Sequence, residues 1–186
     1  MIIRLQDCPP QPWRNGLGRT REIAVHPADA GSGDFLWRVS VAEVDSDAPF
    51  SRFPGIDRQI VLLDGNGFTM TLDDDRVHAL SVPLQPFAFP GEAAVAVTLI
   101  DGATRDFNLM SRRTQVRGEV LPWRQPGDRA VDPAIVLVHC AGGVIDTVDG
   151  PLHAGDAWLS SGRPAAPVTL RHGAAALAVR IEPRTA

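Results

Sequence analysis

The sequence contains no lysine and no tyrosine, and all 18 of its basic residues are arginine. The absence of lysine excludes lysine Schiff-base enzymes, pyridoxal phosphate enzymes and P-loop nucleotide-binding proteins. The absence of tyrosine excludes a tyrosine general acid. Arginine keeps its charge and presents a planar fork of N–H groups that matches a carboxylate. The cationic chemistry left to this chain therefore favours anion binding over proton transfer.

Cysteines, long apolar runs and excess positive charge are also scarce. Cys8 and Cys140 are the only cysteines, and their distance in sequence indicates neither a disulfide framework nor a cysteine-ligated zinc site. No apolar run approaches the roughly 20 residues that span a bilayer, and the N-terminus lacks the pattern of a secretion signal. We therefore expect a cytoplasmic protein with no membrane partner. The net charge of -4 argues against a nucleic-acid partner, because phosphate binding needs a basic face.

The local pattern is that of an all-β protein. Sixteen prolines and 17 glycines separate short runs rich in Val, Leu and Ile, in which apolar and polar residues alternate. No window of about 12 residues shows helical periodicity. Strands are expected at residues 19–24, 35–42, 59–63, 68–72, 94–100, 105–113, 134–139, 144–148, 157–160, 167–171 and 175–181. Because such strands must close on one another to hide their edges, we expect a sandwich or barrel.

Two stretches give more specific local predictions. Residues 35–42 alternate so that apolar side chains share one face, while Arg38 and Ser40 lie on the other, which predicts one buried and one exposed face. Residues 59–63 and 68–72 flank the sequence "DGNG", whose glycines permit a tight turn. These two strands are therefore predicted to form a β-hairpin.

Residues 49–65, "PFSRFPGIDRQIVLLDG", resemble the first motif of cupin barrels, in which two histidines and a glutamate hold a metal ion. On the spacing of that motif, Ser51 and Phe53 take the histidine positions and Arg58 takes the glutamate position. The third histidine of cupin sites falls near residues 87–88, where Phe and Ala stand. We therefore expect no metal and no other cofactor, and a cavity whose guanidinium can bind a carboxylate directly.

The sequence "RDFNLMSRR" gives a second polar cluster. As a strand it places Asp106, Asn108 and Arg112 on one face, which suits the polar wall of a barrel mouth better than a core. A plainer interpretation stays open for both clusters. Asp106 and Arg112 can form an ion pair on an exposed sheet face, and Arg58 can pair with Asp57 or another acid at the surface.

The stretch "PWRNGLGRTRE" at residues 12–22 has the glycines of a phosphate-binding loop. Such a loop leads into a helix and is usually followed by a lysine, whereas here the next residues alternate as a strand. We expect a tight turn that carries Trp13 and Asn15 to the rim of the cavity, with Trp13 as its lid. Thr20 and Glu22 share one face of the following strand and are expected to contact the ligand.

Three stretches in this order are together similar to the HutD/Ves family of bacterial proteins. They are residues 12–24, 35–67 and 101–113. The resemblance implies a bicupin fold, with two cupin-like β-barrels or jelly rolls in one chain. The polar, turn-rich segment 116–129 is expected to cross between sub-barrels at 1–115 and 130–186 of a single bicupin that spans residues 1–186.

The resemblance also implies a function. HutD is associated with histidine utilisation as a non-catalytic modulator that binds a small metabolite, with urocanate and formylglutamate as candidates. Ves-type members are linked to stress or cold response. We therefore expect a metal-independent protein, monomer or homodimer, that binds a small carboxylate. The expected ligand-binding residues are Trp13, Asn15, Thr20, Glu22, Ser51, Phe53, Arg58, Asp106, Asn108 and Arg112.

A catalytic function is the alternative. It is a cupin enzyme, either an isomerase, a lyase or a hydrolase, that acts on a small organic acid. Glu22, Asp57 and Asp106 are the available general bases, since burial beside an arginine could tune any of them.

Overall fold

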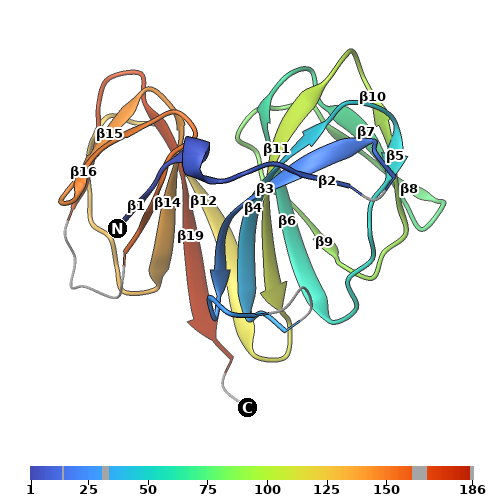
Figure 1. Ribbon diagram of the computed structural model, residues 1–186, viewed down its shortest axis with the longest axis horizontal. Helices are drawn as coiled ribbons and strands as arrows, with labels where there is room; N and C mark the ends of the chain where they lie inside the picture. The colour runs from blue at the N-terminus through green and yellow to red at the C-terminus, as the bar shows by residue number, and fades with distance from the viewer. Residues whose placement is uncertain (14, 31–33, 161–166, 185–186) are drawn as a thin grey trace. The chain divides into compact units, whose positions relative to one another are not determined.

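The computed structural model describes residues 1–13, 15–30, 34–160 and 167–184 of the chain. Within these residues the only helix is a single 3-10 turn, η1 (Leu5–Asp7), and every other regular element is a β-strand (Figure 1). None of these described segments contains a helix that is long and apolar enough to cross a membrane. The prediction of an all-β protein is confirmed, and each expected strand corresponds to an observed one.

The chain forms two compact units. Residues 9–117 make up the larger unit, and residues 118–183 together with residues 1–8 make up the smaller unit. The first residues therefore belong with the end of the chain and not with the sub-barrel expected at 1–115. Figure 1 shows this directly, since β1, drawn in blue, lies among strands drawn in orange and red.

The larger unit contains a six-stranded and a four-stranded antiparallel sheet. The first has the order β2 (Gln11–Pro12), β3 (Gly18–His26), β4 (Trp37–Val44), β11 (Thr104–Arg112), β6 (Ile56–Asp64) and β9 (Phe87–Pro90). The second has the order β5 (Ala48–Pro49), β10 (Val95–Leu99), β7 (Phe68–Leu72) and β8 (Arg76–Leu80). Apolar side chains of both sheets, such as Leu62 and Met70, form one buried cluster. The unit is a jelly roll whose two sheets share this core.

The smaller unit repeats this architecture. Its five-stranded sheet has the order β1 (Ile2–Ile3), β17 (Ala157–Leu159), β14 (Ile135–Gly142), β19 (Ala175–Pro183) and β12 (Val116–Trp123). Its four-stranded sheet has the order β13 (Gly127–Arg129), β18 (Val168–Leu170), β15 (Val144–Thr147) and β16 (Gly150–His153). Val138 of β14, Leu170 of β18 and Trp158 of β17 belong to a single apolar cluster that fills this unit.

The predicted hairpin at residues 59–72 is wrong. β6 pairs with β11 and β9, whereas β7 pairs with β10 and β8, so the two strands lie in different sheets. The turn residues have the expected conformation, because Gly65 and Gly67 have φ angles of 87° and 78°. The turn moves the chain from one sheet to the other. Alternation predicts a strand on each side of a turn, but it does not distinguish pairing from a change of sheet.

The segment expected as a crossover contains two strands. Residues 116–129 include β12 and β13, and β12 forms an edge of its sheet. Pro122 lies within β12, where an edge strand tolerates a residue that cannot donate a backbone hydrogen bond. Val116 and Val120 are its buried side chains. Two buried valines among charged residues are too weak a pattern to predict a strand.

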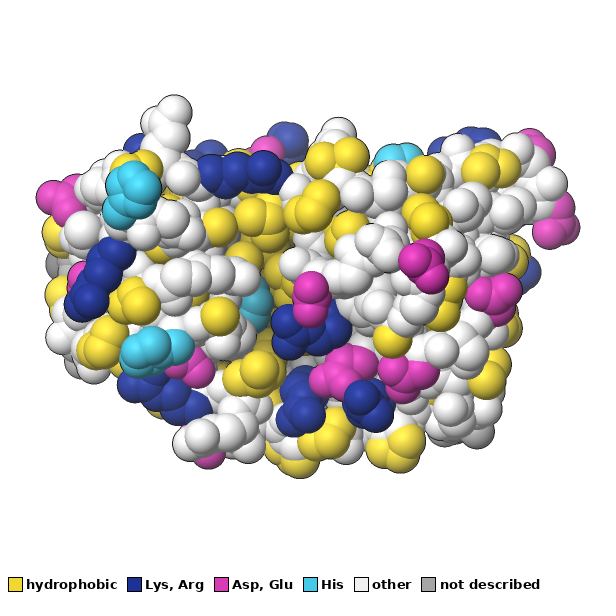
Figure 2. Space-filling model, turned by 90° about the horizontal axis from the view of Figure 1, so that it is seen from above, with side chains coloured by type: hydrophobic (Ala, Val, Ile, Leu, Met, Phe, Trp, Pro, Cys, Tyr) yellow, Lys and Arg dark blue, Asp and Glu magenta, His cyan; other side chains and the backbone are white. Residues whose placement is uncertain are grey.

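Many surface arginines are paired with acids. Arg19 and Arg21 both contact Glu43, and Arg171 donates two hydrogen bonds to Asp146. Figure 2 shows arginine and acidic side chains lying against one another on one face. Arg58 differs, because it is the only buried arginine among the described residues, with 5% of its surface exposed.

We expect Gly67→Ala to destabilise the larger unit. A Cβ at this position would lie 1.8 Å from the carbonyl oxygen of Leu80, on a backbone with a positive φ. The free energy of unfolding should fall by about 3 kcal/mol in urea denaturation.

The matched control is Gly102→Ala. Gly102 has a φ of 75°, but a Cβ there meets no atom of the described chain within 4 Å. This variant should lose only ~1 kcal/mol. Equal losses in the two variants would show that the close approach to Leu80 does not matter.

Candidate functional site

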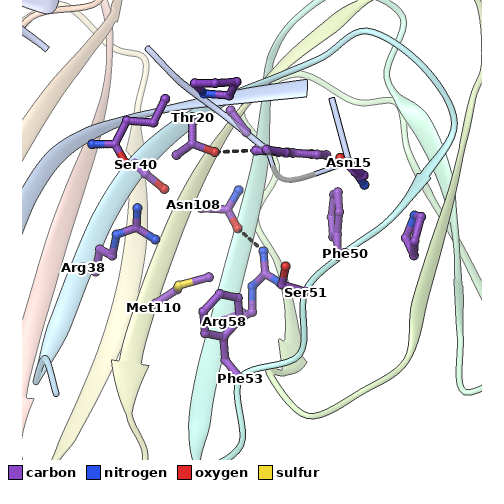
Figure 3. Close-up of a pocket in the computed structure, with 15 residues that line it drawn as sticks. Asn15, Thr20, Arg38, Ser40, Phe50, Ser51, Phe53, Arg58, Asn108 and Met110 are labelled. Atoms are coloured by element: carbon purple, nitrogen blue, oxygen red, sulfur yellow. Dashed lines mark hydrogen bonds between the residues drawn. The ribbon is translucent and has the colours of Figure 1, made fainter. Parts of the chain in front are cut away.

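A cavity of about 600 Å³ lies against the six-stranded sheet of the larger unit (Figure 3). Strands β4, β6 and β11 supply one wall of this cavity. Residues 11–13, Asn15 and the segment 49–53 supply its other sides. The cavity is therefore built from chain segments that are far apart in sequence, and its position is set by the sheet order.

The strand register brings the two arginines of the cavity together. Met110 of β11 lies opposite Arg38 of β4 on one side and Arg58 of β6 on the other. Asn108 lies one row further along the same face, opposite Ser40. All five side chains line the cavity, and Figure 3 shows Asn108 and Met110 between the two guanidinium groups. Arg38 and Arg58 give the cavity its positive charge.

Aromatic rings surround the Arg58 guanidinium. Its central carbon lies 4.8 Å from the ring centre of Phe89, 5.3 Å from that of Phe50 and 5.6 Å from that of Phe53. These distances are within the roughly 6 Å over which a cation is attracted to a ring face. The rings exclude water from the guanidinium but offer it no hydrogen bonds, so its N–H groups must be satisfied by other partners.

Arg58 is connected to a buried carboxylate through an amide. Its Nη2 donates to Oδ1 of Asn108 at 2.8 Å, and Nδ2 of Asn108 donates to Oδ1 of Asp106 at 2.5 Å. Asp106 is fully buried. Nε of Arg58 and Oδ2 of Asp106 have no hydrogen-bond partner within the described part of the chain. The charges are thus linked through Asn108 without a direct ion pair.

Burial shifts the pKa of both charged groups toward their neutral forms. Burial lowers the pKa of Arg58 to about 10, the nearby Asp106 opposes this, and the positive charge of Arg38 adds to it. Burial raises the pKa of Asp106 to about 7, although Arg58 and the hydrogen bond from Asn108 both act in the other direction. Arg58 is therefore a cation at neutral pH, whereas Asp106 is close to the midpoint of its titration.

Arg38 is held from outside the cavity. Its Nε donates to Oε2 of Glu22 at 2.7 Å, and the Arg38 side chain is 20% exposed. Ser40 is buried at 3% exposure, so the prediction that this face of the strand is exposed is wrong. The polar face of β4 is turned toward the cavity.

The glycine-rich turn holds Trp13 in a fixed position. Nε1 of Trp13 donates to Oγ1 of Thr20 at 2.8 Å, and its ring meets the ring of Phe50 edge to face at 6.0 Å. The ring packs so close to Gly18 that a Cβ there would lie 3.0 Å from it. The side chain of Asn15 accepts a hydrogen bond from the backbone N–H of Leu17 within the turn. Trp13 also packs against the core cluster, so it is a structural residue as well as part of the cavity wall.

The donor set of the cavity does not suit a divalent metal ion. Its described lining contains no His, Cys, Asp or Glu side chain, and the described chain holds no group of three such side chains close enough to share an ion. Ser51, Phe53 and Arg58, which the spacing of the cupin motif assigns to its ligand positions, all line the cavity. A guanidinium at this point repels a cation.

Comparison with known proteins places the chain in a family. A family model described as HutD matches residues 5–178. The chain belongs to the HutD family. Protein Ves from Escherichia fergusonii is 36% identical over 150 residues, which cover 80% of this chain and 73% of that protein. The structure of HutD from Pseudomonas fluorescens SBW25, described as a formate condition, matches with a TM-score of 0.86 and 30% identity, over 100% of this chain and 99% of that one.

A more distant comparison concerns the fold of this HutD-family protein alone. The bacterial pirin YhhW from Escherichia coli, in complex with nickel(II), matches with a TM-score of 0.62 at 7% identity. The alignment covers 100% of this chain and 99% of the pirin. Together with the two jelly-roll units, this likeness establishes the cupin-like, bicupin fold for the HutD-family chain.

The cavity is lined by seven of the ten residues that are expected to bind ligand. They are Trp13, Asn15, Thr20, Ser51, Phe53, Arg58 and Asn108. Three do not line it. Glu22 pairs with Arg38, Asp106 lies behind Asn108, and Nε of Arg112 donates to the backbone oxygen of Phe35 at 3.1 Å.

The residues that sequence reasoning missed include Arg38, Ser40, Phe50 and Met110. Arg38 and Ser40 carried a usable signal, because they form the polar face of a strand adjacent to the strand of Asn108.

The two plainer interpretations are also settled. Arg58 is buried and Asp57 pairs with Arg113, so the surface pair between Arg58 and Asp57 is not formed. The exposed face with an Asp106–Arg112 pair is likewise not formed, since Asp106 is buried.

We expect Asp106→Asn to change the pH dependence of stability. The folded protein holds a proton on Asp106 up to about pH 7, whereas the unfolded chain releases it near the ordinary pKa of 3.8. This group therefore stabilises the fold fully below pH 3.8, and its contribution is lost as the pH rises through 7. The amide cannot titrate, so the stability of the variant relative to wild type should increase between pH 5 and 8 in urea denaturation.

Asp75→Asn is the control for this measurement, because Asp75 lies in an exposed turn. Its stability relative to wild type should stay constant over the same pH range. A constant difference for Asp106→Asn as well would show that Asp106 does not titrate between pH 5 and 8.

Proposed function

We propose that this HutD-family protein binds a small carboxylate in the cavity of its larger unit, and that Arg58 holds the carboxylate group. The observation that carries the proposal is a buried, positively charged guanidinium at the cavity wall whose hydrogen-bonded partner, among the residues that the structure describes, is a neutral amide alone. Burying a charge in this way is costly unless a counter-charge approaches it. A ligand carboxylate supplies that charge and forms charge-assisted hydrogen bonds.

The remaining wall chemistry supports a small organic anion over an inorganic one. Arg38 adds a second positive charge, and Asn108 and Ser40 can hydrogen-bond to polar groups. Phe50 and Phe53 add apolar surface beside Arg58. A volume of about 600 Å³ is within the range of small-molecule sites, roughly 300 to 1,000 Å³.

The placement of acidic residues supports binding over catalysis. The three general bases considered for an enzyme are Glu22, Asp57 and Asp106, and none lines the cavity. Glu22 and Asp57 each accept hydrogen bonds from an arginine, Arg38 and Arg113 respectively. Urocanate and formylglutamate are the leading ligand candidates through the association of HutD with histidine utilisation. A Ves-type role in stress response is the other context in which such binding would act.

The test is the replacement of Arg58 by Met, which fills a similar space among the three phenylalanine rings without the charge. We expect the affinity for the best ligand among urocanate, formylglutamate, succinate and formate to fall about 10- to 100-fold, the value of one or two hydrogen bonds to a charged group. Calorimetry measures the affinity. A thermal melt shows whether Arg58→Met still folds.

Two arginine variants are the controls. Arg76→Ala removes an equal charge from exposed β8, and Arg112→Ala removes an arginine that binds the backbone of Phe35 outside the cavity. Both should keep the wild-type affinity. Unchanged affinity in Arg58→Met, or binding of none of the four carboxylates by the wild type, would contradict the proposed function.

A further inference from the structure

Asp106 lies behind the cavity wall and yet is connected to it. Arg58 and Asn108 line the cavity, whereas Asp106 is fully enclosed and is hydrogen-bonded to the wall through Asn108. One carboxylate oxygen of Asp106 accepts the Asn108 amide, and the other, Oδ2, has no donor among the residues that the structure describes. The unused oxygen is a position for a proton, which a buried carboxylate takes up when its counter-charge is lost.

The charged groups around Asp106 are few. Arg58, from β6, is the charged group that acts on Asp106. The cross-strand neighbours of Asp106 are Ala42 of β4 and Leu62 of β6, neither of which is charged. Arg38 of β4 acts on Arg58 and is itself paired with Glu22 of β3. The charge state of Asp106 therefore depends mainly on how much of the Arg58 charge it receives.

An anion in the cavity competes for that charge. When a carboxylate binds Arg58, its negative charge offsets the guanidinium and repels the carboxylate of Asp106. Asp106 is enclosed in protein, so water cannot replace the lost counter-charge. Taking up one proton from solvent on Asp106 removes this repulsion and leaves Arg58 paired with the ligand.

We propose that anion binding in this cavity is coupled to the uptake of one proton by Asp106, transmitted through Arg58 and Asn108. The coupling rests on the proposed function, because it needs an anion at Arg58. In the free protein the pKa of Asp106 is about 7, and a bound anion raises it further. By reciprocity, affinity is highest below pH 7 and declines as the pH rises above it. Asp106 is thus a positioning and charge-balancing residue that never contacts the ligand.

Calorimetry with formylglutamate and benzoate tests the coupling, because both are fully ionised between pH 6 and 8.5. Titrations at pH 7.5 in buffers with different ionisation enthalpies count the protons taken up. The wild type should take up a substantial fraction of one proton per anion. Its dissociation constant should rise roughly threefold or more between pH 6.5 and 8.5.

Asp106→Asn is the decisive variant. The amide keeps the oxygen that accepts the hydrogen bond from Asn108, and it mimics the neutral acid. We expect this variant to take up no proton, to bind equally at pH 6.5 and 8.5, and to bind more tightly than wild type at pH 8.5. A purely structural role for Asp106 would instead weaken binding at every pH. Asp75→Asn should behave like wild type.

Carbon-13 NMR of the Asp106 carboxyl in the wild type gives a test that needs no variant. The carboxyl should titrate near pH 7 in the free protein and at a higher pH with the anion bound. Anion binding with no proton uptake and no dependence on pH would overturn the coupling and leave the proposed function standing. If neither probe binds the wild type, the coupling is refuted, and the four-ligand panel decides the proposed function separately.

Discussion

The burial of one guanidinium, that of Arg58, constrains most of the larger unit. A charge can be kept at 5% exposure only if its surroundings offset the loss of water. Three phenylalanine rings attract the cation, and Asn108 accepts one hydrogen bond from it. Asp106 supplies a counter-charge, to which the guanidinium is linked through Asn108. These partners come from three stretches of the sequence, residues 50–53, Phe89 and residues 106–108, so the register of β6 against β11 and β9 must be kept for the arrangement to exist.

On the spacing of the cupin motif, Arg58 is expected at a position where a metal ligand stands in that motif, which raises the question of what changes when a guanidinium takes it. A metal ion and an arginine both offer positive charge to an anion, but an arginine also fixes the direction of approach through its planar N–H groups. A divalent metal ion is held by imidazole and carboxylate ligands, of which only the carboxylates balance its charge. Here the acid linked to Arg58 through Asn108, Asp106, is buried and does not line the cavity. The positive charge of Arg58 therefore faces the cavity.

Much of this site could be predicted from sequence because strand alternation sorts side chains by face. The pattern placed Asp106 and Asn108 together, and the cupin spacing placed Ser51, Phe53 and Arg58 around one cavity. Alternation does not reveal what covers a polar face. For that reason Ser40 was expected to be exposed, although it is buried against the cavity.

Two further features depend on tertiary pairing and could not be predicted. Glu22 shares its strand with Thr20, but a β-bulge between Glu22 and Ala24 disturbs the register, and Glu22 pairs with Arg38. Arg112 shares a face with Asn108, yet its Nε donates to the Phe35 backbone. A long flexible side chain can reach several partners, so its contacts depend on which residues the fold brings near it and not on the local sequence pattern.

The position of β1 also affects the order in which the strands can pair during synthesis. Ile2 pairs with Trp158 and Ile3 with Ala157, so β1 can find its partner only after residues 157–158 have been synthesised. Residues 9–117 contain both sheets of the larger unit, so that unit can close while the remainder is still on the ribosome. Residues 2–3 must stay without their strand partner until residues 157–158 have been synthesised. The sheets of the larger unit can therefore be complete before β1 joins its sheet in the smaller unit.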